Sequence, residues 1–161
     1  YPLPEAQLDR FLFKLDIEFP QESVELSILR KHANEPLTTG SETKALQSLL
    51  DAADLAESRA LIDGVILEDD ILSYILRLVR ATRESAEITH GASTRAADAL
   101  AGATRAADAL DGRDYAIPDD VKRLYVPALR HRSGLGPTAE SEGRDAATVL
   151  ENVLNQIEAP H

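Results

Sequence analysis

The sequence predicts a mainly α-helical protein that carries one β-strand near its start. Aromatic residues make up only 4% of the 161 residues, and Trp and Met are absent. Leu, Ile, Val and Ala must therefore fill the core, and this set of residues favours helices. Apolar residues also recur at helical spacing along most of the chain, whereas strict alternation is confined to residues 11–17.

The first two elements follow from local signals between two prolines. Pro4 and the acidic residues after it suit a short helix over residues 5–10, because proline is favoured at the first helical position. Residues 11–17 place apolar side chains at every second position, which predicts a half-buried strand that Pro20 ends. Because an unpaired strand edge recruits partners, we expect this strand to pair with a second copy, to fold against the helical part of the chain, or to be disordered.

The next segment combines expected helices with a linker. Apolar spacing predicts a helix over residues 21–33. Residues 34–41 contain a Pro and a Gly and are predicted to form a linker. Two further helices are expected over residues 44–50 and 51–62, and Asp51 is a suitable N-cap for the second.

The chain from residue 69 onward is expected to be mostly helical. A strong helix is predicted over residues 69–82. Its expected buried stripe consists of Leu72, Ile75, Leu76 and Val79. Ser93 is a good N-cap for a long helix, and Pro118, followed by two acids, suits the start of another. Residues 133–143 hold three Gly and one Pro and predict a loop before a last helix over residues 144–157.

Composition narrows the classes of function. The formal net charge of −11 and the lack of a basic stretch argue against direct nucleic-acid binding, which needs clustered Lys and Arg. The absence of Cys excludes disulfides and a Cys nucleophile, and four His residues without paired spacing predict no metal site. No apolar run approaches the ~20 residues of a membrane span, and no signal peptide is visible. We therefore expect a cytoplasmic protein, and the start at Tyr1 suggests a piece of a longer one.

Three segments carry a resemblance to a known family. The first is YPLPEAQLDRF, residues 1–11. The second joins VRATR, residues 79–83, to GASTRA, residues 91–96. The third begins with DGRDY and ends with LRHR, over residues 111–132. In this order they resemble the segment after sensor 1, the sensor 2 region and the lid of MoxR-type AAA+ ATPases.

The resemblance implies an architecture that agrees with the helical prediction. It implies a helical AAA+ lid bundle preceded by one strand left over from the α/β core. Residues 1–20 would end that core, and residues 21–135 would form the lid domain with sensor 2. Residues 136–161 would be a loop and a C-terminal helix packed on the lid.

The same resemblance implies roles for two arginines. Arg10 would be the arginine finger, acting in trans on the charge that develops during phosphoryl transfer. Arg95 would be sensor 2, within the first helical turn after Ser93, where free backbone N–H groups favour anions. It could act on the nucleotide of its own subunit or of a neighbour. Composition alone would make both ordinary surface arginines, with Arg10 paired to Asp9 or Glu5.

The sequence departs from a complete ATPase in one decisive respect. There is no G-x-x-x-x-G-K-[ST] motif, so no loop of backbone amides is available to hold phosphates. The acids at residues 68–70 are better explained as a helix start than as a Mg²⁺ site. This chain by itself is therefore not expected to hydrolyse ATP. Thr94 stands where the family usually has Pro, which could change how rigidly Arg95 is presented.

Two readings of function remain open at this point. The resemblance implies a subunit that uses ATP and Mg²⁺ in a homo-oligomeric, hexameric ring to remodel client proteins, in some cases beside a von Willebrand factor A-domain partner. The alternative is a stand-alone acidic helical module that binds protein partners and has no ATPase role. The basic cluster of residues 130–132 could contact a neighbouring subunit or cap a helix.

Overall fold

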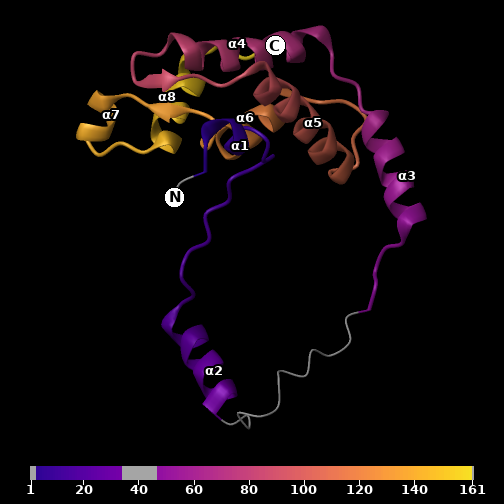
Figure 1. Ribbon diagram of the computed structural model, residues 1–161. Coiled ribbons are helices and arrows are strands. Elements are labelled where there is room, and N and C mark those ends of the chain that lie inside the picture. The colour runs from indigo at the N-terminus through magenta and orange to yellow at the C-terminus, as the bar shows by residue number, and fades with distance from the viewer. Residues whose placement is uncertain (1–2, 34–46, 161) are drawn as a thin grey trace. The chain divides into compact units, whose positions relative to one another are not determined.

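The computed structural model describes residues 3–33 and 47–160, which fall into two compact units (Figure 1). The first unit contains the described residues up to Leu15 and those from Ala56 onward, and the second is Asp16–Leu55. The sequence-based boundaries at residues 20 and 135 stay predictions. Among the described residues, no helix is both long enough and apolar enough to cross a bilayer.

The second unit contains the helix α2 and the start of α3. The helix α2 spans Glu22–Ala33, which confirms the helix expected there. The helix α3 spans Ala52–Asp63 and begins as expected, because the Asp51 carboxylate accepts hydrogen bonds from the backbone N–H groups of the first turn at 2.7 and 2.9 Å. The predicted linker over residues 34–41 lies outside the described residues. The predicted helix over 44–50 is wrong in its described part, since residues 47–50 are not helical.

The core of the first unit lies between α4, α5, α6 and α8 (Figure 1). These helices are Asp69–Glu84, Thr94–Leu110, Pro118–Leu129 and Ala146–Gln156, and the short helices α1 and α7 are Glu5–Leu8 and Pro137–Ser141. The largest fully buried side chains come from all four core helices and include Tyr74, Leu78, Leu100, Tyr125, Leu129 and Leu150. The mainly helical fold class is thereby confirmed.

The buried face of α4 differs from the predicted stripe. Ile75 and Val79 are buried as expected, but Leu72 and Leu76 are 42% and 48% exposed. The helix instead buries residues at a steady three- and four-residue spacing, which are Ile71, Tyr74, Ile75, Leu78, Val79 and Thr82. The predicted stripe took Leu72 and Leu76 in place of Ile71 and Leu78, and it left out the two buried residues that carry hydroxyl groups, Tyr74 and Thr82.

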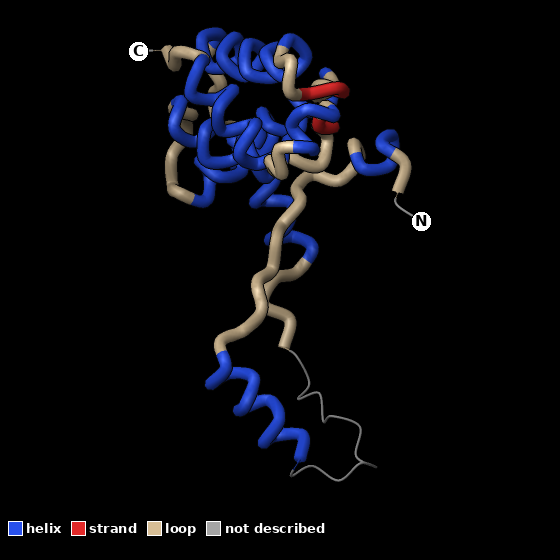
Figure 2. The backbone as a smooth tube through the Cα atoms, turned by 90° about the vertical axis from the view of Figure 1, so that its left-hand side faces the viewer, coloured by secondary structure: helices blue, strands red, loops and turns tan. Residues whose placement is uncertain are grey.

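A two-stranded antiparallel sheet lies beside the helices, red in Figure 2. Its strands are β1, Ile88–His90, and β2, Gly134–Leu135. Both are too short to show an alternating pattern, and β2 and α7 lie in the segment predicted as a loop. The last helix was predicted closely, and Asp145 caps it by accepting a hydrogen bond from the Thr148 N–H at 2.7 Å.

The strand predicted over residues 11–17 does not form. Phe13 is half-buried and packs against the core, whereas Phe11 is 56% exposed and Ile17 is 94% exposed. The backbone of this segment is bonded to helix α6 and the residues after it, not to a neighbouring strand, and the Lys14 N–H donates to the Pro127 carbonyl at 3.1 Å. Of the three expected outcomes, residues 11–14 show the second, because they fold against the helical part of the first unit. Alternation is a local signal, whereas a strand needs a partner strand to bond its backbone.

Candidate functional site

Arg10 lies in the turn after α1, with an exposed side chain. Its guanidinium forms no hydrogen bond or ion pair with another described residue. The expected surface pairing with Asp9 or Glu5 is therefore not formed. Glu5 lies instead 3.6 Å from the imidazole of His90. The result is an unpaired cation at the surface of the first unit.

The backbone on both sides of Arg10 is held by three residues at the end of α6, which we call the carbonyl clamp: Arg130, His131 and Arg132. The Arg132 Nη2 donates to the Phe11 carbonyl at 2.7 Å, and the His131 Nε2 lies 2.8 Å from the same oxygen. The Arg130 Nε donates to the Lys14 carbonyl at 2.7 Å. The basic cluster thus binds a segment of its own chain that is more than a hundred residues away.

Burial lowers the pKa of two members of the carbonyl clamp, Arg132 and His131. The Arg132 side chain is only 2% exposed. Burial lowers its pKa, Asp9 opposes that shift, and the like charge of Arg95 adds to it. The guanidinium nevertheless stays charged. Burial also lowers the pKa of His131, so the imidazole is neutral near pH 7 and its Nε2–H donates to the carbonyl oxygen of Phe11.

Asp9, the residue before Arg10, connects the N-terminal segment to the start of α5. Both of its carboxylate oxygens accept from the Ser93 hydroxyl, at 3.0 and 3.1 Å. Its Oδ1 also lies 3.5 Å from the Arg132 Nε. Ser93 is the N-cap of α5 as predicted, since its Oγ accepts from the Ala96 N–H at 3.2 Å. One hydroxyl therefore caps the helix and binds Asp9.

Arg95 lies in the first turn of α5 and is exposed. Its guanidinium, like that of Arg10, forms no hydrogen bond or ion pair within the described part of the chain. Its influence on the pKa of Arg132 shows that the two cations are close. The free N–H groups of the helix start add positive potential at the same place. The structure thus brings Arg95 and the Arg10 segment together around Asp9 and Arg132.

The start of α5 is fixed by contacts that sequence reasoning missed. The Thr82 hydroxyl accepts from the Ala92 N–H at 2.9 Å, and the Arg83 Nε donates to the Ala92 carbonyl at 2.8 Å. Gly91 allows this close approach, because a Cβ there would lie 2.6 Å from the Arg83 Cα. The motif segments VRATR and GASTRA therefore act together to place the helix that carries Arg95. The only signal in the sequence was a Thr-Arg pair at a helix end and a Gly before the next cap.

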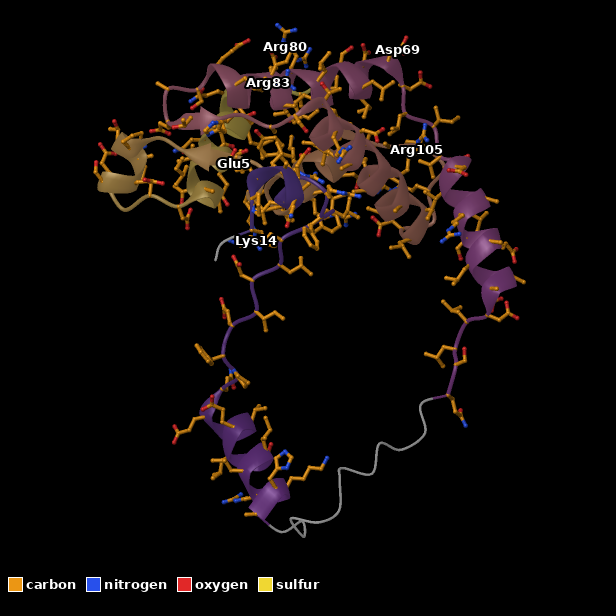
Figure 3. All side chains as sticks on the ribbon, in the orientation of Figure 1. Glu5, Lys14, Asp69, Arg80, Arg83 and Arg105 are labelled. Carbon is orange, nitrogen blue, oxygen red and sulfur yellow. The ribbon has the colours of Figure 1, made fainter. Side chains whose placement is uncertain are left out.

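A pocket of about 580 Å³ lies between the N-terminal segment and residues 130–134. Glu5 and Lys14, both labelled in Figure 3, line it together with Asp9 and Arg132, so side chains of both signs face it. No group of His, Asp or Glu residues suited to a metal ion exists within the described ranges.

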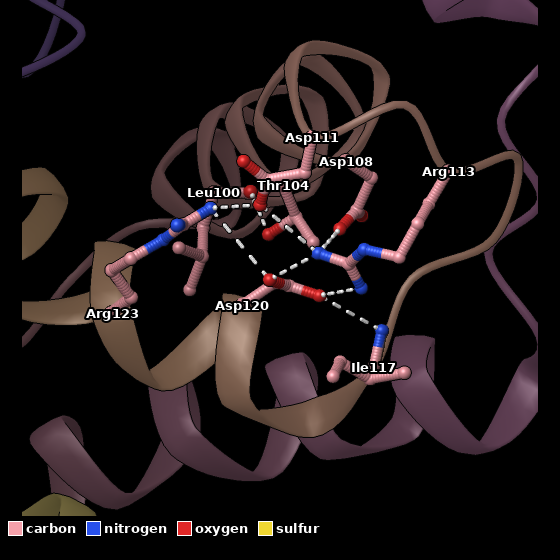
Figure 4. A network of polar contacts seen from close by, with 8 residues as sticks. All are labelled: Leu100, Thr104, Asp108, Asp111, Arg113, Ile117, Asp120 and Arg123. Carbon is pink, nitrogen blue, oxygen red and sulfur yellow. Dashed lines mark hydrogen bonds and ion pairs between the residues drawn. The ribbon is translucent and has the colours of Figure 1, made fainter.

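A second polar cluster lies at the other end of α5 (Figure 4). The Arg113 guanidinium binds both oxygens of Asp120 at 2.7 Å and lies 2.9 Å from the Asp108 carboxylate. Burial raises the pKa of Asp108 to about 7, whereas the hydrogen bond from Arg113 lowers the pKa of Asp120. Asp120 also accepts from the Ile117 N–H at 3.2 Å. This cluster holds the end of α5 against the start of α6, so we assign it to the stability of the fold and not to the candidate functional site.

Comparison with known proteins shows which family this chain resembles. A model of the AAA lid domain matches residues 80–153. The chain is 30% identical over 169 residues to the chaperone MoxR1 of Mycobacterium tuberculosis, covering 99% of this chain and 43% of the relative. The chain is thus similar to the lid-bearing, C-terminal part of MoxR-type AAA+ proteins. The family that the three sequence segments indicated is thereby confirmed.

Two further comparisons extend the MoxR-type match. The chain is 35% identical over 161 residues to the uncharacterized protein YeaC of Bacillus subtilis, covering 99% of this chain and 48% of that protein. It also superimposes on the crystal structure of a candidate ATPase from Cytophaga hutchinsonii with a TM-score of 0.83 and 32% identity, over 100% of this chain and 50% of that one. The chain thus spans about half the length of the relatives that it matches.

Proposed function

We propose that this chain serves ATP hydrolysis in a ring of MoxR-type AAA+ subunits, and that Arg10 is the arginine finger that acts on the nucleotide of a neighbouring subunit. One observation carries the proposal: Arg10 is an unpaired, exposed cation whose flanking backbone is held by buried groups. A merely solvated surface arginine does not need such support. The match to MoxR-type relatives along nearly the whole chain adds to it.

Phosphoryl transfer from ATP is accelerated by an exposed arginine that has no carboxylate partner of its own. Phosphoryl transfer spreads negative charge over the equatorial oxygens of the transferred group, and an arginine supplied in trans is worth ~10³–10⁵ in rate. The guanidinium must arrive without a competing carboxylate. Asp9 meets that requirement, because its carboxylate is engaged by Ser93 and Arg132 and leaves Arg10 free. Fixed flanking residues also reduce the entropy lost when the finger engages.

We assign Arg95 the sensor 2 role within the same proposal. It is exposed, has no carboxylate partner among the described residues, and sits at a helix N-terminus where an anion is favoured. These properties suit contact with a terminal phosphate. Whether that phosphate belongs to its own subunit or to the neighbour stays open.

The chain fits ATP only in part. It offers two unpaired arginines toward phosphate, but its sequence lacks the phosphate-binding loop. That loop would have to come from residues outside this chain. When bound, Mg²⁺ neutralises charge on the β- and γ-phosphates. Arg10 and Arg95 then complement that site rather than form it.

The wider biological role is proposed from the relatives. Because one relative is named a chaperone, we propose that the assembled protein remodels or helps to assemble client proteins. A homo-oligomeric, hexameric ring in the cytoplasm is part of the proposal, as is a von Willebrand factor A-domain protein as partner. The acidic net charge of −11 disfavours nucleic acid as the client.

The direct test is the Arg10→Ala variant of the assembled full-length protein. We expect kcat to fall by ~10²-fold or more while ATP affinity stays nearly unchanged, because the contact forms mainly in the transition state. Arg95→Ala should change affinity and turnover together. Arg59→Ala is the control, because Arg59 is an exposed arginine on a helix. Unchanged kcat for Arg10→Ala would remove the finger assignment, and an assembled wild-type protein without ATPase activity would favour the interaction module.

A further inference from the structure

We propose that Asp9 is a positioning residue that ties the candidate finger Arg10 to the candidate sensor Arg95, so that the two arginines move as one unit. This inference rests on the proposed function. It assigns a role to the bridge between Asp9 and Ser93, which joins residues 84 positions apart.

The bridge connects the two arginines by very short lengths of chain. Arg10 directly follows Asp9, and Arg95 lies two residues after Ser93. The Ser93 hydroxyl has one proton, which it donates to the Asp9 carboxylate, and its lone pair accepts from the Ala96 N–H. A shift of the α5 start therefore pulls on Asp9, and a shift of Asp9 disturbs the cap of α5.

The bridge is also sheltered from solvent. The Asp9 side chain is 25% exposed, and its second partner, Arg132, is 2% exposed. A hydrogen bond to an ionised acceptor is shorter and stronger than one between neutral groups, and partly buried charges are screened little by salt. Asp9 is thus unlike an exposed ion pair, which holds two side chains together only weakly.

Arg132 also restrains the backbone around Arg10. Its Nη2 donates to the carbonyls of Asp9, at 3.1 Å, and Phe11, at 2.7 Å, on either side of Arg10. The peptide units that flank Arg10 therefore have little freedom to move without Arg132 and Ser93. In the assembled protein, a displacement of α5 caused by nucleotide at Arg95 would be transmitted to Arg10.

The geometry can be tested by reversing the bridge. Ser93→Asp keeps an acceptor that caps α5 but places one carboxylate against another. Asp9→Asn in that background restores a hydrogen bond of opposite direction, because the amide donates to the new carboxylate. Asp9→Ala breaks the bridge from the other side and leaves the cap between Ser93 and Ala96 intact. Ser93→Thr is the conservative control, since it keeps a hydroxyl at this position.

Hydrogen exchange of the full-length protein reports on the bridge independently of catalysis. We expect the amides of residues 7–11 to exchange faster in Ser93→Asp and Asp9→Ala, and to return toward wild-type rates in the double variant. Equal exchange in wild type and Asp9→Ala would mean that the bridge does not restrain the segment, and the inference would be lost.

ATPase kinetics of the same full-length variants test the coupling. We expect kcat to fall roughly 10- to 100-fold in Ser93→Asp and in Asp9→Ala with KM nearly unchanged, since small misplacements of a catalytic group have effects of this size. The double variant should recover most of the loss, which a merely structural defect would not do. If Arg10→Ala is harmless, the proposed function fails. If Arg10→Ala is damaging but Asp9→Ala has full kcat, only the coupling fails.

Discussion

The Thr82 hydroxyl is fully buried and serves two backbone groups at once. It donates to the Val79 carbonyl at 2.7 Å and accepts from the Ala92 N–H at 2.9 Å. Thr82→Val keeps the shape of the side chain but leaves the buried Ala92 N–H without a partner. We expect a loss of roughly 1–3 kcal/mol in the free energy of unfolding, measured by urea denaturation. Thr94→Val, at an exposed position, is the control, and equal stabilities of the two variants would contradict the role of Thr82.

A second single residue, Asp108, predicts how the stability of the fold depends on pH. Its pKa is about 3.9 in an unfolded chain and is raised to about 7 by burial in the fold. Between these values the folded state binds the additional proton, so the contribution of Asp108 to stability is fully present below about pH 4 and is lost as pH rises through about 7. The lowered pKa of Asp120 acts only below about pH 4, outside this window.

The check is the pH dependence of the thermal midpoint between pH 4 and 8. Asp108→Asn cannot release a proton, so its midpoint should decline less over this range than that of the wild type. Asp98→Asn changes an exposed residue of the same helix and should keep the wild-type slope. Parallel slopes for wild type and Asp108→Asn would show that the carboxyl does not titrate in this window.

At the scale of elements, local signals were predicted well and non-local ones were not. The caps at Asp51 and Ser93 were predicted because a capping side chain bonds to residues only two or three positions away. The pairing of Ile88 with Leu135 could not be predicted, since its strands are too short to show a period. The alternation of residues 11–17 predicted a strand that does not form, because the partners of their backbone lie in α6 and in the residues after it.

The start of α5 carries a further prediction. Thr94 is the first residue of this helix, where the N–H has no acceptor within the helix and proline is favoured. Thr94→Pro should therefore keep the helix and leave stability unchanged or raised by about 0.4–1 kcal/mol. Circular dichroism and thermal melting measure this effect. Ala99→Pro, inside the same helix, should be strongly destabilising, and a similar loss in both variants would mean that the assigned helix start is misplaced.

At the scale of the whole molecule, the sequence suggested the candidate site residues through the family resemblance and left their surroundings unknown. Arg10 and Arg95 were candidates because of the motifs around them. Their closeness to Asp9 and Arg132 depends on contacts across 84 and 123 positions, which no spacing rule reveals. The helical fold class was predictable, because helix signals lie within a few turns of the chain.

We propose that Arg10 acts across a subunit interface, and a mixing experiment on the full-length protein can test this role. One variant carries Arg10→Ala, and the other lacks the lysine of the phosphate-binding loop that the proposed function requires in the rest of the protein. Each should be nearly inactive alone. Mixed and reassembled, they should regain part of the ATPase activity, because some interfaces then pair an intact finger with an intact nucleotide site. A mixture no more active than the average of its two components would contradict a finger that acts in trans.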